Sequence, residues 1–150
     1  MLRVLAFIIF CSSLATSVNA QRFRDPRSYY KEFANENRRI TIKNIRYLEG
    51  VVKGEDPRRV DKYREMVVDQ LKDSKRAIEQ VGTFKDDDLL QREYLQALDM
   101  FLNAFEQNFG KAEELTEDRF QDFEKLKKYF AAMEEAEADM FEAYYKIQEA

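Results

Sequence analysis

The chain has 150 residues, of which 36% are charged and 45% hydrophobic, with 25 Lys+Arg against 29 Asp+Glu. It contains 4 Gly, 2 Pro, 1 Cys and no His. Without histidine the chain lacks the side chain that titrates nearest neutral pH and the commonest ligand of zinc, copper and haem. The scarcity of Gly and Pro, with abundant Ala, Glu, Lys, Leu and Phe, predicts one helical domain rather than a sheet or a disordered chain.

The first twenty residues differ in composition from the rest of the chain. Arg3 supplies a positive charge, an apolar run follows through Phe10, and small or polar residues lead to Ala20. This pattern predicts a signal peptide over residues 1–20, cleaved after Ala20, and export to the periplasm or cell surface. The apolar run is shorter than the roughly 20 residues that a membrane-spanning helix needs, so a retained anchor is the less favoured alternative. Cys11 follows Phe10 rather than a small residue, which argues against lipidation.

Residues 21–150 then form a single domain without cysteine, in which we expect four helices at about 26–49, 57–81, 87–114 and 117–148. Asp-Pro pairs at 25–26 and 56–57 each supply an N-cap and a proline at the first helical position. Gly50 and Gly82 suit the left-handed residue that ends a helix.

The third and fourth helices have weaker boundary signals. The carboxylates of residues 86–88 suit a helix N-terminus, and Thr116 suits the cap of the last helix. Gly110 lies inside the third apolar stripe, so we expect one long helix with a weak point. A kink at Gly110 is left open by the sequence.

Apolar residues recur at intervals of three and four in all four segments, which predicts one buried stripe on each helix. The four stripes are Tyr30, Phe33, Asn37, Ile40, Asn44, Leu48 and Val51; Val60, Tyr63, Val67, Leu71, Ser74, Ile78 and Val81; Leu90, Tyr94, Leu98, Phe101, Phe105, Phe109, Ala112 and Leu115; and Phe120, Phe123, Phe130, Met133, Met140, Phe141, Tyr144 and Ile147. The short connections force sequential helices to be antiparallel, so the predicted fold is an all-α, up-down-up-down four-helix bundle.

The charge is unevenly divided along the chain. Residues 21–81 carry 16 Lys+Arg and 11 Asp+Glu, a net charge of +5, whereas residues 82–150 carry 8 and 18, a net charge of −10. The two halves can attract each other across the bundle, an effect that salt screens. Alternatively, a basic stripe on the first helix contacts an anionic membrane surface. Its residues are Arg39, Lys43, Arg46 and Lys53. Nucleic acid is not expected as a partner, because the chain is exported and acidic and its aromatic residues fall on the apolar stripes.

Three polar residues interrupt the apolar stripes: Asn37 and Asn44 in the first, and Ser74 in the second. A polar residue on a helix seam can fix the register between helices, as it does in coiled coils. The alternative is a small interior polar patch that orients a ligand.

No enzymatic chemistry is indicated. The Glu-x-x-His pairs of di-iron bundles need histidine, and the acidic clusters do not match an EF-hand loop. The few hydroxyl residues lack an activating base, since Ser74 and the adjacent Lys75 point to different faces of a helix. We therefore expect no catalytic residue, no metal and no cofactor.

Four segments carry a resemblance to a known group of proteins: Tyr29-Tyr30, the corner at residues 83–86, residues 94–106, and the ending at residues 144–148. Together they resemble a loosely defined family of small bacterial surface proteins from spirochaetes and related Gram-negative groups. Members usually continue beyond the final Gln, a point at which this sequence departs from the family; whether the native chain continues past Ala150 is left open by the sequence. The resemblance implies an exported helical bundle, and no activity is established for the family.

The sequence thus predicts an exported, non-enzymatic helical bundle that binds or assembles in the cell envelope. The partner is an unidentified envelope component, and an oligomer is compatible with this role. The alternative is a carrier or sensor that holds a small apolar ligand between its helices.

Overall fold

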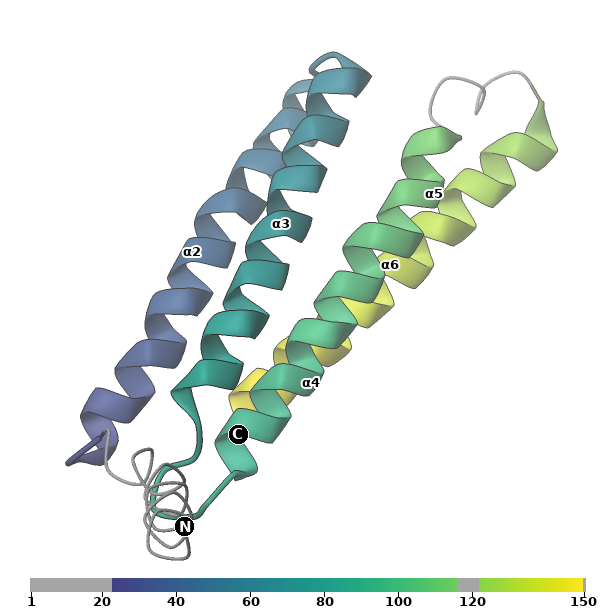
Figure 1. The fold of residues 1–150 in the computed structure, drawn as a ribbon. Helices are drawn as coiled ribbons and strands as arrows, with labels where there is room; N and C mark the ends of the chain where they lie inside the picture. Colours follow the sequence, from purple (N-terminus) through teal and green to yellow (C-terminus); the bar gives the residue numbers. More distant parts are fainter. Residues whose placement is uncertain (1–22, 116–121, 150) are drawn as a thin grey trace, which may run out of the picture.

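A computed structural model describes residues 23–115 and 122–149 as an all-α, up-down-up-down four-helix bundle (Figure 1). Its first two helices are α2 (Pro26–Lys53) and α3 (Pro57–Val81). The third is a continuous helical run made of α4 (Leu89–Asn103), the π-helical turn η1 (Ala104–Asn108) and α5 (Phe109–Glu114), and the fourth is α6 (Phe123–Glu149). The predicted signal peptide at residues 1–20 and the predicted cap Thr116 lie outside the described residues.

The Asp-Pro pairs begin α2 and α3 as predicted. The Asp25 carboxylate accepts a hydrogen bond from the backbone N–H of Ser28 at 2.9 Å, and that of Asp56 accepts one from Arg58 at 3.0 Å. Each carboxylate satisfies a backbone donor that has no partner inside the helix. Gly82 ends α3 as predicted, with a positive φ of 76°, although its ψ of −167° is not that of the expected left-handed helical conformation.

The predicted end of the first helix at Gly50 is wrong. Helix α2 continues through Gly50 and ends at Lys53, where Gly54 takes the left-handed conformation at a φ of 63°. Gly50 instead serves helix packing: a Cβ at this position would lie 3.0 Å from Cδ2 of Tyr63 on α3. Two glycines lie near this turn. Gly50 allows α3 to approach closely, and Gly54 adopts the left-handed conformation that ends the helix.

The third helix begins two residues later than predicted, at Leu89. Lys85 and Asp86 have positive φ values of 53° and 67°, so the chain is still turning there. The backbone N–H of Leu89 donates to the Asp87 carboxylate at 2.9 Å. The helical run then passes through Gly110, as expected, and the turn that departs from α-helical geometry is η1, just before this glycine.

The fourth helix begins at Phe123 rather than at residue 117. Asp122 caps it, because its carboxylate accepts a hydrogen bond from the backbone N–H of Lys125 at 2.8 Å. Residues 117–121, which the sequence placed in this helix, lie outside the described part of the chain.

The buried stripes of α3 and of the third helical run agree with the prediction, whereas that of α2 is rotated. Tyr29 and Tyr47 are buried, and their neighbours Tyr30 and Leu48, which the sequence placed in the core, are 53% and 44% exposed. The ring of Tyr47 meets that of Phe105 edge-on, with centroids 5.6 Å apart. Aromatic contacts of this kind join α2 to the third helical run.

Helix α6 also differs from its predicted stripe. Its fully described buried positions are Ala132, Ala136 and Ala143, while Phe130 and Phe141 are 60% and 64% exposed. Alanines allow the backbone of α6 to approach the third run closely, so the large aromatic side chains are left outside. The predicted core residues Phe123 and Tyr144 are exposed for the same reason.

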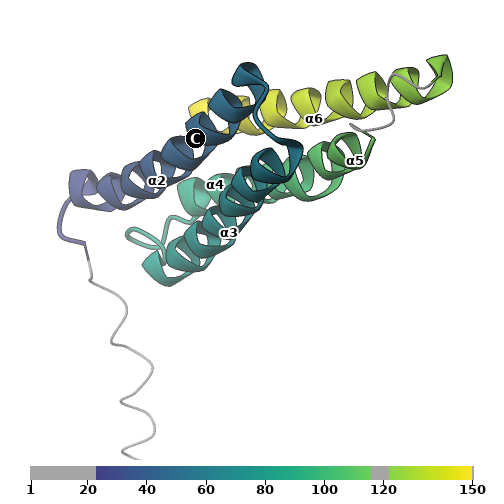
Figure 2. The ribbon, with the colours of Figure 1, turned by 90° about the horizontal axis from the view of Figure 1, so that it is seen from above.

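The bundle consists of two hairpins whose outer helices stay apart. Helix α2 packs along α3, α3 packs against the third run, and α6 packs along the other side of that run (Figures 1 and 2). Within the described residues, no Cα atom of α2 lies within 8 Å of a Cα atom of α6. The backbones of the first and last helices therefore do not pack directly against each other, although side chains of both line one cavity.

Candidate functional site

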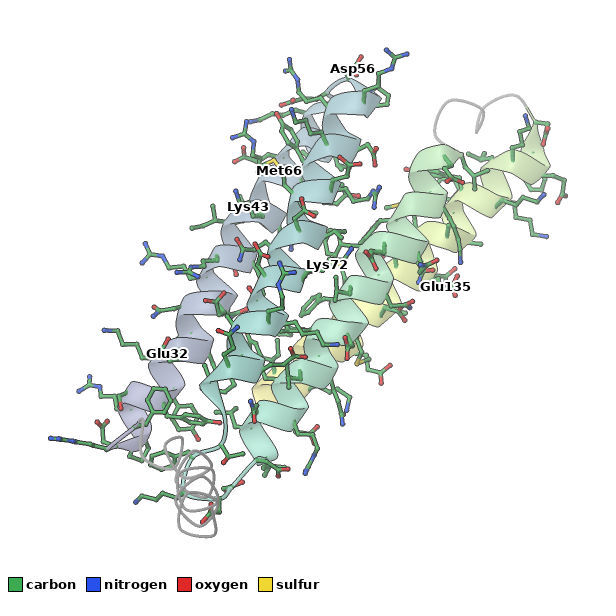
Figure 3. All side chains as sticks on the ribbon, viewed as in Figure 1. Glu32, Lys43, Asp56, Met66, Lys72 and Glu135 are labelled. Carbon is green, nitrogen blue, oxygen red and sulfur yellow. The ribbon has the colours of Figure 1, made fainter. Side chains whose placement is uncertain are left out.

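The predicted basic stripe lies on α2, and three of its four cations have a partner on the protein. Arg39 forms an ion pair with Glu36 at 2.8 Å and Lys53 forms one with Glu49 at 3.4 Å. The guanidinium of Arg46 lies 4.8 Å from the centre of the Tyr63 ring. Lys43 is half-buried, and no described residue pairs with it. Lys43 on α2 and Glu135 on α6 lie at opposite edges of the molecule in the view of Figure 3.

Exposed aliphatic side chains accompany these cations. Ile42, Ile45 and Val52 are 57%, 51% and 85% exposed. At 3.6 residues per turn, Ile45 and Val52 lie opposite the buried face of α2, and Ile42, Arg46 and Lys53 lie beside them. Arg39 and Lys43 lie at the edge of the buried face. We call this set of seven residues the α2 outer surface. Sequence reasoning missed its aliphatic members, although their signal was present: they are apolar residues that fall off the predicted core stripe.

The predicted interior polar patch is only partly interior. Asn37 is exposed, so its predicted place in the core is wrong. Asn44 is half-buried, and its side-chain oxygen is buried without a hydrogen-bond partner among the described residues. Ser74 is fully buried, as the stripe predicted.

The partner of Ser74 is a residue that the sequence analysis did not single out. The Ser74 hydroxyl donates to Oε2 of Glu36 at 2.8 Å, and it accepts a hydrogen bond from the side-chain amide of Gln70 at 3.2 Å. Glu36 is 7% exposed, and its other carboxylate oxygen accepts from Arg39. This network joins α2 to α3 across the core. The sequence did indicate that Glu36 lies on the buried face, because it is three residues after Phe33 and four before Ile40.

A cavity of about 310 Å³ lies among α2, α3, α5 and α6, and its lining mixes apolar side chains with polar groups such as Glu55. Its lining includes Tyr47, Val51, Val60, Phe109, Ala112 and Met133. The volume is at the lower end of the range for small-molecule sites. From the sequence alone, the aromatic interior could equally be fully packed or contain a gap of ligand size.

A polar groove of about 460 Å³ runs between α3 and the π-helical turn. Arg64 lies on it and donates to the backbone oxygen of Phe105 at 2.8 Å, while its other nitrogens donate to Asp61. On the opposite side of the turn, Asp139 of α6 accepts hydrogen bonds from Asn103 and Asn108. These hydrogen bonds hold the irregular turn in place from two sides.

Ion pairs join the two hairpins as the charge division predicts. Lys75 of α3 pairs with Asp99 of α4 at 2.5 Å, and Lys72 pairs with Glu106 of the π-helical turn. These bridges are partly exposed, so each contributes about 1 kcal/mol or less to stability.

The described residues contain no group of three or more acidic side chains placed to hold a metal ion. Burial raises the pKa of the Tyr94 phenol well above its ordinary value of 10.0, with a smaller contribution from the nearby Glu36. The Tyr94 hydroxyl contacts the backbone oxygen of Phe33 at 3.4 Å. Tyr94 is therefore a neutral core residue.

Comparison with protein-family models, curated proteins and solved structures finds no match to this chain. Among the described helices, none is long and apolar enough to cross a membrane.

Proposed function

We propose that this protein is an exported, non-enzymatic binding protein that attaches to an anionic lipid surface of the cell envelope through the α2 outer surface. The observation that carries this proposal is the exposure of Ile42, Ile45 and Val52 among four cations. Exposed aliphatic side chains lose contact with water when they enter the headgroup region of a bilayer, and cations are attracted to anionic headgroups.

The expected affinity follows from these two contributions. Each Lys or Arg near an anionic membrane surface contributes about 1 kcal/mol, and burial of each aliphatic side chain adds about 1 kcal/mol or more. Neither contribution alone gives stable attachment. Together they predict reversible, salt-sensitive binding, because the electrostatic part is screened by salt.

Vesicle sedimentation tests this proposal. The protein should bind vesicles that contain phosphatidylglycerol and should not bind vesicles of phosphatidylcholine alone. Replacing Arg39, Lys43 and Arg46 with Glu should weaken binding by about a hundredfold or more, since each lost attraction is worth about 1 kcal/mol and each 1.4 kcal/mol is tenfold. Unchanged binding by this variant would refute the proposal.

Two further variants separate the effect of net charge from the effect of the α2 outer surface itself. Glu at Arg58, Arg59 and Lys62 changes the net charge equally but on exposed positions of α3, and it should leave most of the binding intact. Ser at Ile42, Ile45 and Val52 keeps every charge and should weaken binding to the same vesicles. Equal loss in the α3 variant would mean that only the net charge matters.

Export rests on the predicted signal peptide and is tested separately. In a bacterial host, the protein recovered from the periplasm or surface should begin at Gln21 when its N-terminus is analysed by mass spectrometry. A protein that retains residues 1–20 in the cytoplasm would contradict this part of the proposal.

The cavity favours a second candidate function, a carrier of a small apolar ligand. Aromatic and aliphatic side chains such as Tyr47, Phe109 and Met133 line one part of it, and Glu55 lines another part. A long-chain fatty acid such as myristate should raise the unfolding temperature, because a ligand that binds only the folded state stabilises it. Ala112→Leu, which partly fills the cavity, should abolish this shift. No shift with the unmodified protein would refute the carrier function.

A further inference from the structure

Helix α6 presents a row of exposed aromatic side chains that the bundle does not use. This α6 aromatic surface consists of Phe123, Phe130, Phe141, Tyr144 and Tyr145, which are between 53% and 75% exposed. Their spacings of seven, eleven and three or four residues place them on one side of the helix. Glu134 and Glu137 lie between Phe130 and Phe141 on this side. Five exposed aromatic side chains on one side of a helix mark an interaction surface.

Helix α2 presents a second uncovered strip on the flank next to its core face, apolar near its two ends and polar at Asn37 and Thr41 between them. Tyr30, Leu48 and Val51 form this α2 flank and are between 41% and 53% exposed. These residues belong to the stripe that the sequence predicted to be buried. In a closed four-helix bundle the first and last helices pack against each other. Here the described parts of α2 and α6 stay apart, so neither strip is covered by the other helix.

The charges of the two helices determine which pairing between molecules is favourable. Helix α2 carries 7 Lys+Arg and 3 Asp+Glu, whereas α6 carries 4 and 7. Two copies of α2 repel each other, and so do two copies of α6. Only α2 against α6 combines apolar contact with opposite charge. A twofold axis makes this contact twice, once in each direction, because each copy carries both helices.

The available area is sufficient for a stable dimer. If each aromatic side chain offers about 200 Å², of which somewhat more than half is exposed, the α6 aromatic surface buries about 600 Å² per copy. The α2 flank adds to this area. A standard interface buries about 800 Å² per partner, so the two strips together reach the expected size.

We infer that the partner of these strips is a second copy of this chain, in a twofold dimer in which the α6 aromatic surface of each copy packs on the α2 flank of the other. The inference is independent of membrane attachment, since that proposal uses the α2 outer surface. In the dimer, α6 of one copy lies beside α2 of the other, where a closed bundle would have its own last helix.

Molar mass measured by light scattering on the purified full chain tests the inference. At micromolar concentration the protein should have twice the mass of one chain. Replacing Phe130 and Phe141 with Ser should return it to the mass of one chain without loss of helical circular dichroism. Ile42→Ser, a matched exposed apolar residue on the outer surface of α2, should leave the dimer intact.

A charge-reversal pair tests the reciprocal geometry. Arg27→Glu with Arg38→Glu removes the net positive charge of α2, on the outer side next to the α2 flank, and Glu134→Arg with Glu137→Arg makes the α6 aromatic surface basic. Each variant alone should be monomeric, because the substituted side chains then face like charges in both contacts. An equal mixture should restore a dimer, because in one contact the substituted side chains then face opposite charges and the other contact is native.

Three results would overturn the inference. They are a monomeric native chain, a dimer that survives the Phe130 and Phe141 replacements, and a charge-reversal mixture that stays monomeric. A monomeric native chain would mean that the strips close on each other within one molecule or contact another partner. Vesicle binding is measured on the same variants: loss of binding in the Phe130 and Phe141 variant with an unchanged mass would assign the aromatic row to the membrane instead.

Discussion

The hydrogen bond between Ser74 and Glu36 gives the sharpest test of how the core is held together. Ser74→Ala removes the hydroxyl that donates to the Glu36 carboxylate at a fully buried position. A hydrogen bond to a charged group contributes about 1.5–3 kcal/mol. Glu36 keeps its second partner, Arg39, so we expect the middle of this range, a loss of about 2 kcal/mol in the free energy of unfolding.

This loss is measurable by urea unfolding followed by circular dichroism, and it corresponds to a fall of about 4–8 °C in unfolding temperature. Thr41→Ala is the matched control, because the Thr41 hydroxyl is exposed and bonds only within its own helix, to the Asn37 carbonyl. Both replacements gain the same small increment of helix propensity from alanine. The control should therefore be neutral or slightly stabilising.

A double-mutant cycle with Glu36→Leu then isolates the pair. Ser74→Ala should cost much less in a chain that already carries Glu36→Leu, since no buried carboxylate is left without a donor. A Ser74→Ala variant within about 0.5 kcal/mol of the native chain, or equal costs in the two backgrounds, would show that the carboxylate of Glu36 is solvated.

Two further predictions concern backbone geometry and pH. Gly54→Ala should lower stability by about 1 kcal/mol, because residue 54 has a left-handed φ of 63°. Gly110→Ala should raise stability by up to about 1 kcal/mol, because its Cβ would meet only the Arg64 side chain, at 3.7 Å. Urea unfolding of the two variants measures both changes. Stability should fall as pH rises above 10.0, because burial raises the pKa of Tyr94 and only the unfolded chain then ionises it. Tyr94→Phe should reduce this slope, and an unchanged slope would contradict the assignment.

Local chemistry explains which parts of the fold the sequence predicted well. The Asp-Pro starts of α2 and α3 and the end of α3 at Gly82 depend on a few adjacent residues, and all three positions were predicted. The rotated stripe of α2 depends on distant contacts instead. Tyr29 and Tyr30, like Tyr47 and Leu48, are neighbouring apolar residues, so periodicity alone cannot choose which of each pair is buried.

The candidate sites were predicted less well, because packing decided them. Apolarity alone favours placing Phe130 and Phe141 inside, but the close approach of α6 to the third helical run selects Ala132, Ala136 and Ala143. The π-helical turn changes the hydrogen bonding of the backbone, which side-chain periodicity does not report. The four cations of α2 were found by spacing, but the aliphatic residues between them were identified only from their exposure.

The separation of α2 and α6 has a consequence for how the chain folds. In the described residues, the two helices most distant in sequence do not pack together, so helix pairing proceeds mainly between neighbours along the chain. Topologies dominated by such near-sequence contacts fold rapidly, because little loop entropy is lost before contacts form. Local opening should then begin at α6, which packs only on the third helical run, while α2 and α3 remain paired. Amide hydrogen exchange should therefore be faster along α6 than along α3.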